Sequence, residues 1–168
     1  MIGFVILNYC TFNDTVTCIE SIRANTENYH IVVVDNQSPD NSYVALTEKY
    51  NGVERILIIQ APSNRGFASG NNIGIRKCVD LGIEHIIVTN SDVVFLGDAA
   101  EVLVGCLIEH NAVIAGPQIL DENGAKDWLP NIKRKGYLQY LGWRRSQNTL
   151  LDADYSGESC EVKLVSGC

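Results

Sequence analysis

The hydrophobic positions of this chain form short apolar runs that alternate with segments of helical spacing. Four runs have strand length and end in polar residues: IGFVILN (2–8), HIVVVD (30–35), RILIIQ (55–60) and HIIVTN (85–90). Runs that are apolar at nearly every position are typical of strands covered on both faces. A fifth run, AVIAGPQI (112–119), predicts one more strand.

Apolar side chains recur at helical spacing between these runs. Four helices are predicted: one capped by Asn13 or Asp14, one around Val44 to Tyr50, one from Ala68 to Leu81 with Gly82 ending it, and one that begins with a capping box at Asp98 and Glu101. Strands and helices that alternate in this way form right-handed βαβ units. The predicted fold class is therefore α/β, with a Rossmann-like, mainly parallel sheet and helices on both faces.

The alternation stops after residue 120. Asn123 and Gly124 predict a small hairpin, residues 129–158 show no clear period, and EVKLVSG (161–167) resembles a last strand. A chain of 168 residues fits one domain, 1–168, with a core over 1–120 and a different, irregular region over 121–168. Because the sequence stops directly after an apolar strand, we expect the native chain to continue.

The composition argues against several functional classes. The net charge of -7 argues against nucleic-acid binding, which needs a basic surface. The apolar start is too short to span a bilayer and lacks the basic flank of a signal peptide, so a cytoplasmic protein is expected. The six cysteines form no CxxC pair, which favours reduced thiols in a reducing compartment.

Polar side chains follow the predicted strands at their carboxyl ends. In an open parallel sheet, ligands bind beyond these ends, so the polar residues there are candidate site residues: Asn8, Tyr9, Asp35, Asn90, Ser91 and Asp92. Asp35 alone supports two interpretations, a turn former or a carboxylate that accepts a hydrogen bond from a ribose hydroxyl or a base. The sequence does not decide between them.

The stretch TNSDVVF (89–95) also has two interpretations. It is either a solvated turn or a site for a hard divalent cation, Mg²⁺ or Mn²⁺, in which Asp92 supplies the charged oxygen and Asn90 a neutral one. A cation would solve an electrostatic problem, because an acidic protein otherwise repels a diphosphate.

The stretch NRGFASGNNIGI (64–75) places three glycines and three asparagines around the start of a helix. This composition lowers helix propensity, and a glycine-rich loop with a weakened helix start is the simplest interpretation. The alternative is ligand contact, with Arg65 and the exposed backbone N–H groups facing a phosphate or a base edge.

Four motifs in this order, VILNY, VVVDNQSPDNS, NRGFASGNNIGI and TNSDVVF, resemble glycosyltransferase family 2, which has the GT-A fold. The similarity is to its bacterial rhamnosyltransferase-like branch and covers about residues 2–120. It implies a glycosyltransferase that takes a nucleotide-diphosphate sugar as donor and a saccharide or lipid-linked acceptor, in polysaccharide biosynthesis at the cell envelope. Residues 121–168 would then begin the acceptor-binding part.

The resemblance also implies residue roles. Asn8, Tyr9 and Asp35 would frame the base and ribose, Asn64, Arg65, Gly66 and Asn72 would line the nucleotide pocket, and the acidic metal motif would fall on Asn90, Ser91 and Asp92. Here an amide, Asn90, replaces the first carboxylate of that motif, which implies weaker metal affinity. The implied reaction is a single displacement with inversion, and its general base would lie beyond the end of this sequence, so the chain as given would bind donor without transferring sugar. Asp152, Asp154 and Glu158 are candidates by proximity alone.

Rival interpretations remain. The amide at Asn90 also fits a non-catalytic nucleotide-sugar-binding or scaffold domain, whereas an enzyme that makes the activated sugar would need a glycine-rich basic loop after the first strand, and NYCTFND has none. The segment from Lys133 to Arg145 is basic and aromatic, which is typical of a solvated surface or of peripheral contact with the inner face of the membrane or an anionic acceptor. The sequence leaves homodimerisation open.

Overall fold

The computed structural model describes residues 1–117 and 120 of the chain. It divides into two units, Met1–Glu101 and a second that begins at Val102. The element order is β1 (Ile2–Asn8), α1 (Phe12–Asn25), β2 (Tyr29–Asp35), α2 (Ser42–Lys49), β3 (Ile56–Gln60), α3 (Phe67–Asp80), β4 (His85–Asn90) and α4 (Ala99–Glu109). The predicted alternation of strands and helices is confirmed, and each described strand begins within one residue of its predicted start.

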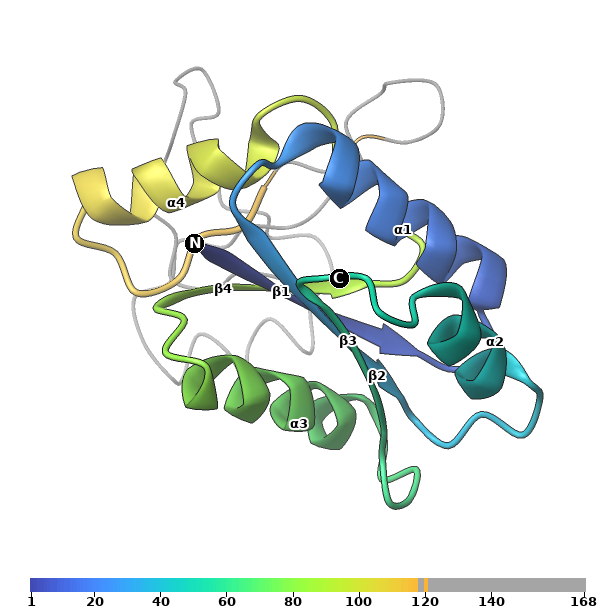
Figure 1. Ribbon diagram of the computed structural model, residues 1–168. Helices are drawn as coiled ribbons and strands as arrows, with labels where there is room; N and C mark the ends of the chain where they lie inside the picture. Colours follow the sequence, from blue (N-terminus) through green and yellow to red (C-terminus); the bar gives the residue numbers. More distant parts are fainter. Residues whose placement is uncertain (118–119, 121–168) are drawn as a thin grey trace, which may run out of the picture. The chain divides into compact units, whose positions relative to one another are not determined.

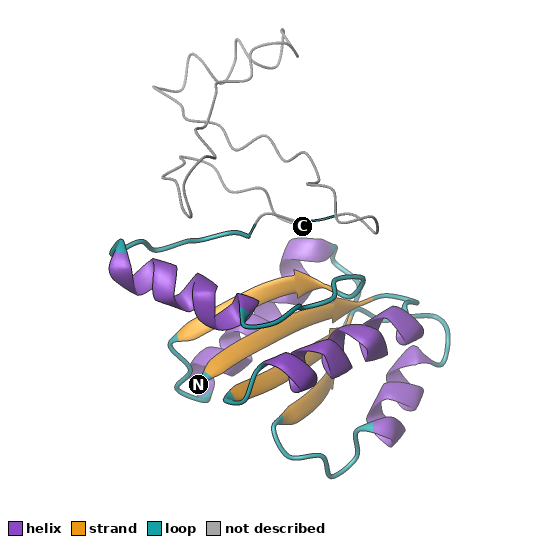
Figure 2. Cartoon of the chain, turned by 90° about the horizontal axis from the view of Figure 1, so that it is seen from above, coloured by secondary structure: helices purple, strands orange, loops and turns teal. Residues whose placement is uncertain are grey.

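The first unit is built on a four-stranded sheet with the order β3-β2-β1-β4. All three strand pairs are parallel, and the register sets Asn8 beside Asp35 and Leu7 beside Asn90. The chain thus steps outward from β1 to β3 and then returns across β1 to β4. With right-handed crossovers, the return requires α3 to lie on the face opposite α1 and α2, as Figures 1 and 2 show. The predicted Rossmann-like sheet with helices on both faces is confirmed.

Two apolar layers, one on each face of the sheet, hold this unit together. The same strands contribute to both layers, because alternate side chains of a strand point to opposite faces. Val5, Val32 and Val34 pack with Cys78 of α3 and Ile83 in one cluster. On the other face, fully buried side chains come from β1, β2, α1 and α2: Phe4, Ile6, Ile31, Val33, Cys18, Ile19, Ile22 and Leu46. Both central strands are therefore covered on both faces, as their uninterrupted apolar runs indicate.

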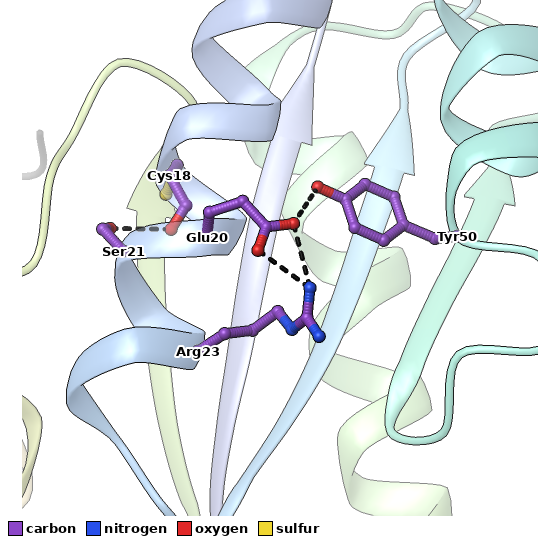
Figure 3. Close-up of polar contacts among 5 residues, drawn as sticks. All are labelled: Cys18, Glu20, Ser21, Arg23 and Tyr50. Carbon is purple, nitrogen blue, oxygen red and sulfur yellow. Dashed lines mark hydrogen bonds and ion pairs between the residues drawn. The ribbon is translucent and has the colours of Figure 1, made fainter.

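A polar cluster connects the two helices on the α1 face (Figure 3). The Tyr50 hydroxyl donates to Glu20 Oε1 at 3.0 Å, and Arg23 Nη1 lies 2.8 Å from Glu20 Oε2. Burial and the Glu20 carboxylate both raise the pKa of Tyr50 above its ordinary value, so this hydroxyl stays a donor. The cluster ties Tyr50, the residue after α2, to the middle of α1.

The structure corrects two sequence predictions. Helix α1 begins at Phe12 with Thr11 at its N-cap, so neither Asn13 nor Asp14 caps it, and no side chain makes a capping hydrogen bond there. The strand predicted over 112–119 is wrong for residues 112–117, which form no strand. The side chains of Val113 and Ile114 are 94% and 69% exposed. An apolar run forms a strand only where a neighbour satisfies its backbone, which periodicity alone does not reveal.

Several predictions lie outside the described residues: the hairpin at Asn123 and Gly124, the strand over 161–167, the basic segment from Lys133 to Arg145, and Asp152, Asp154 and Glu158. Within the described part of the chain, no helix is both long and apolar enough to cross a membrane.

Candidate functional site

The candidate site lies at the point where the sheet reverses its strand order. Crossovers leave β1 toward β2 on one side, and the chain returns on the other side at β4. In open α/β sheets, the carboxyl ends of the strands at such a reversal form a crevice. A hollow of about 250 Å³ opens between the ends of β1 and β4 and is lined by eight residues: Leu7, Tyr9, Thr11, Asp14, Phe67, Asn90, Ser91 and Asp92.

Four of the ten predicted site residues line this hollow. Tyr9, Asn90, Ser91 and Asp92 come together there, although β1 and β4 are far apart in the sequence. Thr11, Asp14 and Phe67 also line the hollow, although the sequence did not predict them as site residues. Phe67 lies inside the NRGFASGNNIGI motif, which is a candidate for ligand contact, whereas the sequence predicts Asp14 only as a helix cap. Asp14 reaches the hollow because the first turn of α1 follows β1 closely and is bonded to the ends of β1 and β4 through Thr15 and Thr11.

Asn8 and Asp35 end the neighbouring strands β1 and β2 side by side, and both are fully buried. Asn8 Nδ2 donates to Asp35 Oδ2 at 2.7 Å, and the Ser38 hydroxyl donates to the same oxygen at 2.6 Å. Asp35 Oδ1 accepts the backbone N–H of Ser38 at 3.0 Å. A buried carboxylate needs several donors of this kind. Neither residue lines the hollow, and their predicted contact with base and ribose stays a prediction.

A chain of hydroxyl groups extends this network to the loop after β4. Thr15 and Thr11 donate to Asn8 Oδ1 at 2.8 and 3.1 Å, and Thr11 Oγ1 lies 2.9 Å from Ser91 Oγ. A hydroxyl has one proton, so when Thr11 donates to Asn8, Ser91 is the donor to Thr11. The N-cap hydroxyl of α1 thus connects the ends of β1 and β4 instead of capping its own helix.

The loop that carries Asp92 is also anchored at its far end. The Phe95 backbone N–H donates to Ser21 Oγ, and its carbonyl accepts from Asn25 Nδ2, both at 3.0 Å. Its ring packs edge-to-face on Phe4 with the centroids 5.3 Å apart. Asp92 therefore sits in a short segment held at Ser91 and at Phe95, which suits a group that must be placed accurately.

The buried thiol of Cys18 lies under this loop. Its Sγ is 3.8 Å from the carbonyl oxygen of Asn90. Burial first, and then the negative charge of Asp92, raise the pKa of the Cys18 thiol to about 12. The group stays a neutral thiol at physiological pH and acts as part of the packing.

The loop before α3 lies beside the end of β2. Asn36 Nδ2 donates to Asn64 Oδ1 at 3.1 Å, and the same oxygen accepts the Gly66 backbone N–H at 3.0 Å. Gly66 has φ of 86°, a conformation that favours glycine, and no side chain caps α3 there. Asn64, Arg65, Gly66 and Asn72 are exposed and do not line the hollow.

Asn71, beside them in the motif, is buried, and neither its amide oxygen nor its nitrogen has a hydrogen-bond partner among the described residues. Asn36 Oδ1 is likewise buried and unpartnered there. Unsatisfied buried amides are costly and often mark functional regions.

The hollow offers only oxygen donors to a metal ion. They are the carboxylates of Asp14 and Asp92, the amide oxygen of Asn90 and the hydroxyls of Tyr9, Thr11 and Ser91. Mg²⁺ and Mn²⁺ prefer such donors and keep ligands from water or phosphate. Within the described residues, no three histidine, cysteine or acidic side chains gather to enclose an ion. The donor set therefore fits a divalent ion that is shared with a bound diphosphate.

The chain matches a known protein family over most of its length. Residues 4–163 match the family described as Glycosyl transferase family 2. The chain belongs to that family. Its predicted membership and GT-A fold are thereby confirmed.

Relatives of this family 2 chain are longer proteins. The dTDP-rhamnosyl transferase RfbF of Shigella flexneri is 32% identical over 111 residues, which are 66% of this chain and 36% of that protein. A crystal structure of S. aureus TarS 1-349 in complex with UDP-GlcNAc has a TM-score of 0.53 at 17% identity and covers 66% of this chain and 32% of that one.

A mannosyltransferase from Pyrobaculum calidifontis, in complex with GDP-Man and Mn²⁺, also has a TM-score of 0.53, at 16% identity, and covers 70% of this chain and 33% of that one. The family 2 chain thus spans about a third of the length of these relatives. At such low identity, the two structural matches show a shared fold.

Proposed function

We propose that this chain is the donor-binding part of a glycosyltransferase, which transfers a sugar from a nucleotide-diphosphate sugar to a saccharide or lipid-linked acceptor in the cytoplasm, at the inner face of the membrane. The observation that carries the proposal is the hollow at the strand reversal, where Tyr9 meets Asn90, Ser91 and Asp92. The name of the RfbF relative and the nucleotide sugars bound to the two structural relatives support it.

The described residues suggest how a donor would be held. The Tyr9 side chain is 48% exposed at the hollow and offers a ring on which a base can stack. Asp92 and Asn90 would hold the divalent ion, which neutralises charge on the departing diphosphate when it is bound. Asn64, Arg65, Gly66 and Asn72 would contact the nucleotide from the α3 side, and Asn8 and Asp35 would frame the base and ribose.

The proposed reaction is a single displacement at the anomeric carbon. The bond from that carbon to the diphosphate breaks, a bond to the acceptor oxygen forms on the opposite side, and the acceptor proton passes to a general base. That base is proposed to lie in the acceptor-binding part, outside the described residues. The residues of the first unit would therefore bind and orient the donor.

Thermal unfolding of the 168-residue chain tests donor binding. At about tenfold excess over Kd, dTDP, UDP or GDP with Mn²⁺ should raise Tm by roughly 3–6 °C. Asp92→Ala should abolish this rise, whereas Asp80→Asn, which removes an exposed carboxylate outside the hollow, should keep it. If none of the three nucleotides with Mn²⁺ shifts Tm, the proposal is wrong.

The amide at Asn90 favours a second candidate, a nucleotide-sugar-binding domain without transfer activity. Loss of one carboxylate weakens the stabilisation of the leaving group while leaving base and ribose contacts in place. The two candidates differ in product formation. A native chain with its downstream residues should release nucleoside diphosphate from the donor when acceptor is present if it is an enzyme, and should bind donor without release if it is not.

A further inference from the structure

The hollow at the strand reversal carries negative charge from two separate elements. Among its eight lining residues, Asp14 of α1 and Asp92 after β4 are carboxylates, and none is basic. Both side chains are exposed, and neither has an ion pair or a hydrogen bond within the described part of the chain. A diphosphate that enters this hollow therefore meets two uncompensated negative charges.

The first turn of α1 is fixed relative to the site, so Asp14 stays at the hollow. Thr11, three residues before it, lies 2.9 Å from the Ser91 hydroxyl, and Thr15, directly after it, donates to buried Asn8 at 2.8 Å. These contacts join the helix turn to both strand ends. The Asp14 carboxylate is thereby held at the same hollow as Asp92, although it belongs to no part of the TNSD stretch.

We propose that Asp14 is the second carboxylate of the donor site and makes nucleoside diphosphate binding depend on a divalent cation. This inference rests on the proposed function. Asn90 stands where the metal motif of the family has its first carboxylate, and it brings no charge. Asp14 supplies a second negative charge to the hollow from α1. Without a cation, both carboxylates repel the diphosphate; with one, both attract the ion that the diphosphate shares.

Asp14 also stabilises its own helix, and the test must separate this effect from its proposed role in cation-dependent binding. It lies in the first turn of α1, where a negative charge stabilises any helix. Glu101 has the same place in the first turn of α4 and does not line the hollow. Glu101→Gln is therefore a matched control, since it removes a first-turn charge and leaves the hollow unchanged.

Calorimetry of the 168-residue chain with dTDP tests the proposal. The measured quantity is the ratio of Kd in EDTA to Kd in Mn²⁺, for the wild type, Asp14→Asn, Asp14→Glu and Glu101→Gln. The ratio should fall about tenfold in Asp14→Asn, because binding in EDTA tightens while binding with Mn²⁺ weakens. It should be retained in Asp14→Glu, which keeps the charge, and unchanged in Glu101→Gln.

Thymidine provides an internal reference, since it has the base and sugar but no phosphate. Its affinity should be equal in the wild type and in Asp14→Asn, with or without Mn²⁺. An unchanged ratio in Asp14→Asn, or a wild type that binds dTDP equally well in EDTA and Mn²⁺, would overturn the role of Asp14 while leaving donor binding intact. Absence of binding by dTDP, UDP and GDP under every condition would overturn both proposals.

Discussion

Asn8 shows how one residue can determine the shape of the site without lining it. A carboxamide donates and accepts at the same time, so Asn8 joins the buried Asp35 carboxylate on one side to the hydroxyls of Thr11 and Thr15 on the other. The position of Asn8 at the end of β1 was predictable from the apolar run before it. Its burial was not, because a polar residue at a strand end is equally consistent with a ligand contact and with a buried hydrogen-bond network.

Replacing Asn8 tests this role. Asn8→Ala leaves the Asp35 carboxylate with one donor fewer and the buried Thr15 hydroxyl without its acceptor. We expect a loss of about 2–5 kcal/mol in the free energy of unfolding, measured by urea denaturation. Thr17→Ala, which removes an exposed hydroxyl bonded only within α1, should cost less than about 0.5 kcal/mol. A loss for Asn8→Ala as small as that of the control would show that the network does not hold the fold.

At the scale of elements, α3 shows why its glycines occur where they do. Gly70 and Gly74 face the sheet, and a Cβ on either would collide with a valine or leucine of β1. Their spacing of four residues predicts close backbone approach, and packing on β1 and β2 accounts for it without a ligand. Gly66 differs, since its backbone conformation is the one that requires glycine.

The effect of added volume on α3 can be measured directly. In Gly74→Ala, the new methyl group would overlap Val5 Cγ1 and lie 3.2 Å from Val34 Cγ2. Overpacking costs about 1–3 kcal/mol and should exceed the gain of about 1 kcal/mol that alanine brings to a helix. Gly105→Ala in α4, where a Cβ meets nothing within 4 Å, should be neutral or stabilising in the same urea titration. A stabilised Gly74→Ala would contradict the close packing of α3.

At the scale of the whole unit, the reversal of strand order decides which residues meet. Parallel strands all end at one edge, but only the neighbours β1 and β4 bring Tyr9, Asp14 and Asp92 to one hollow. Asp35 ends the neighbouring strand β2, and Asn64, in the loop between β3 and α3, bonds to Asn36 directly after that strand. Thus polar strand ends that are equivalent in the sequence divide into two neighbouring groups in the structure.

Cysteine labelling reports on the integrity of this unit. Cys18 of α1 and Cys78 of α3 lie on opposite faces of the sheet and are fully buried, whereas Cys10 is exposed. Burial raises the pKa of both buried thiols, with Asp92 adding to that of Cys18, so at pH 8 they remain protonated and unreactive.

We expect iodoacetamide to modify Cys10 in the native chain and to reach Cys18 and Cys78 only when urea unfolds the unit, as followed by peptide mass spectrometry. The two buried thiols should become reactive at the same urea concentration, because both layers share one sheet. Native labelling of Cys18 as fast as that of Cys10 would contradict the packing of α1.

The order and type of elements in the first unit were predictable because each strand and helix has its own hydrophobic period. Strands β1 and β4 have their predicted bounds, and Gly82 adopts the left-handed conformation expected after a helix. The run over 112–119 failed as a prediction, since a strand also requires a pairing neighbour. Asp14 was not predicted for a similar reason, since its place at the hollow depends on tertiary contacts of the first turn of α1 with the ends of β1 and β4.

The sequence by itself determined the alternation of elements, the polar ends of the strands and the membership in glycosyl transferase family 2, because these are read from local patterns and motifs. Only the tertiary structure decided that Asn8 and Asp35 are buried while Tyr9 and Asp92 share a hollow, and that Asp14 joins them. The physical reason is that burial and convergence arise from strand order and packing between residues distant in the chain, which no local pattern encodes.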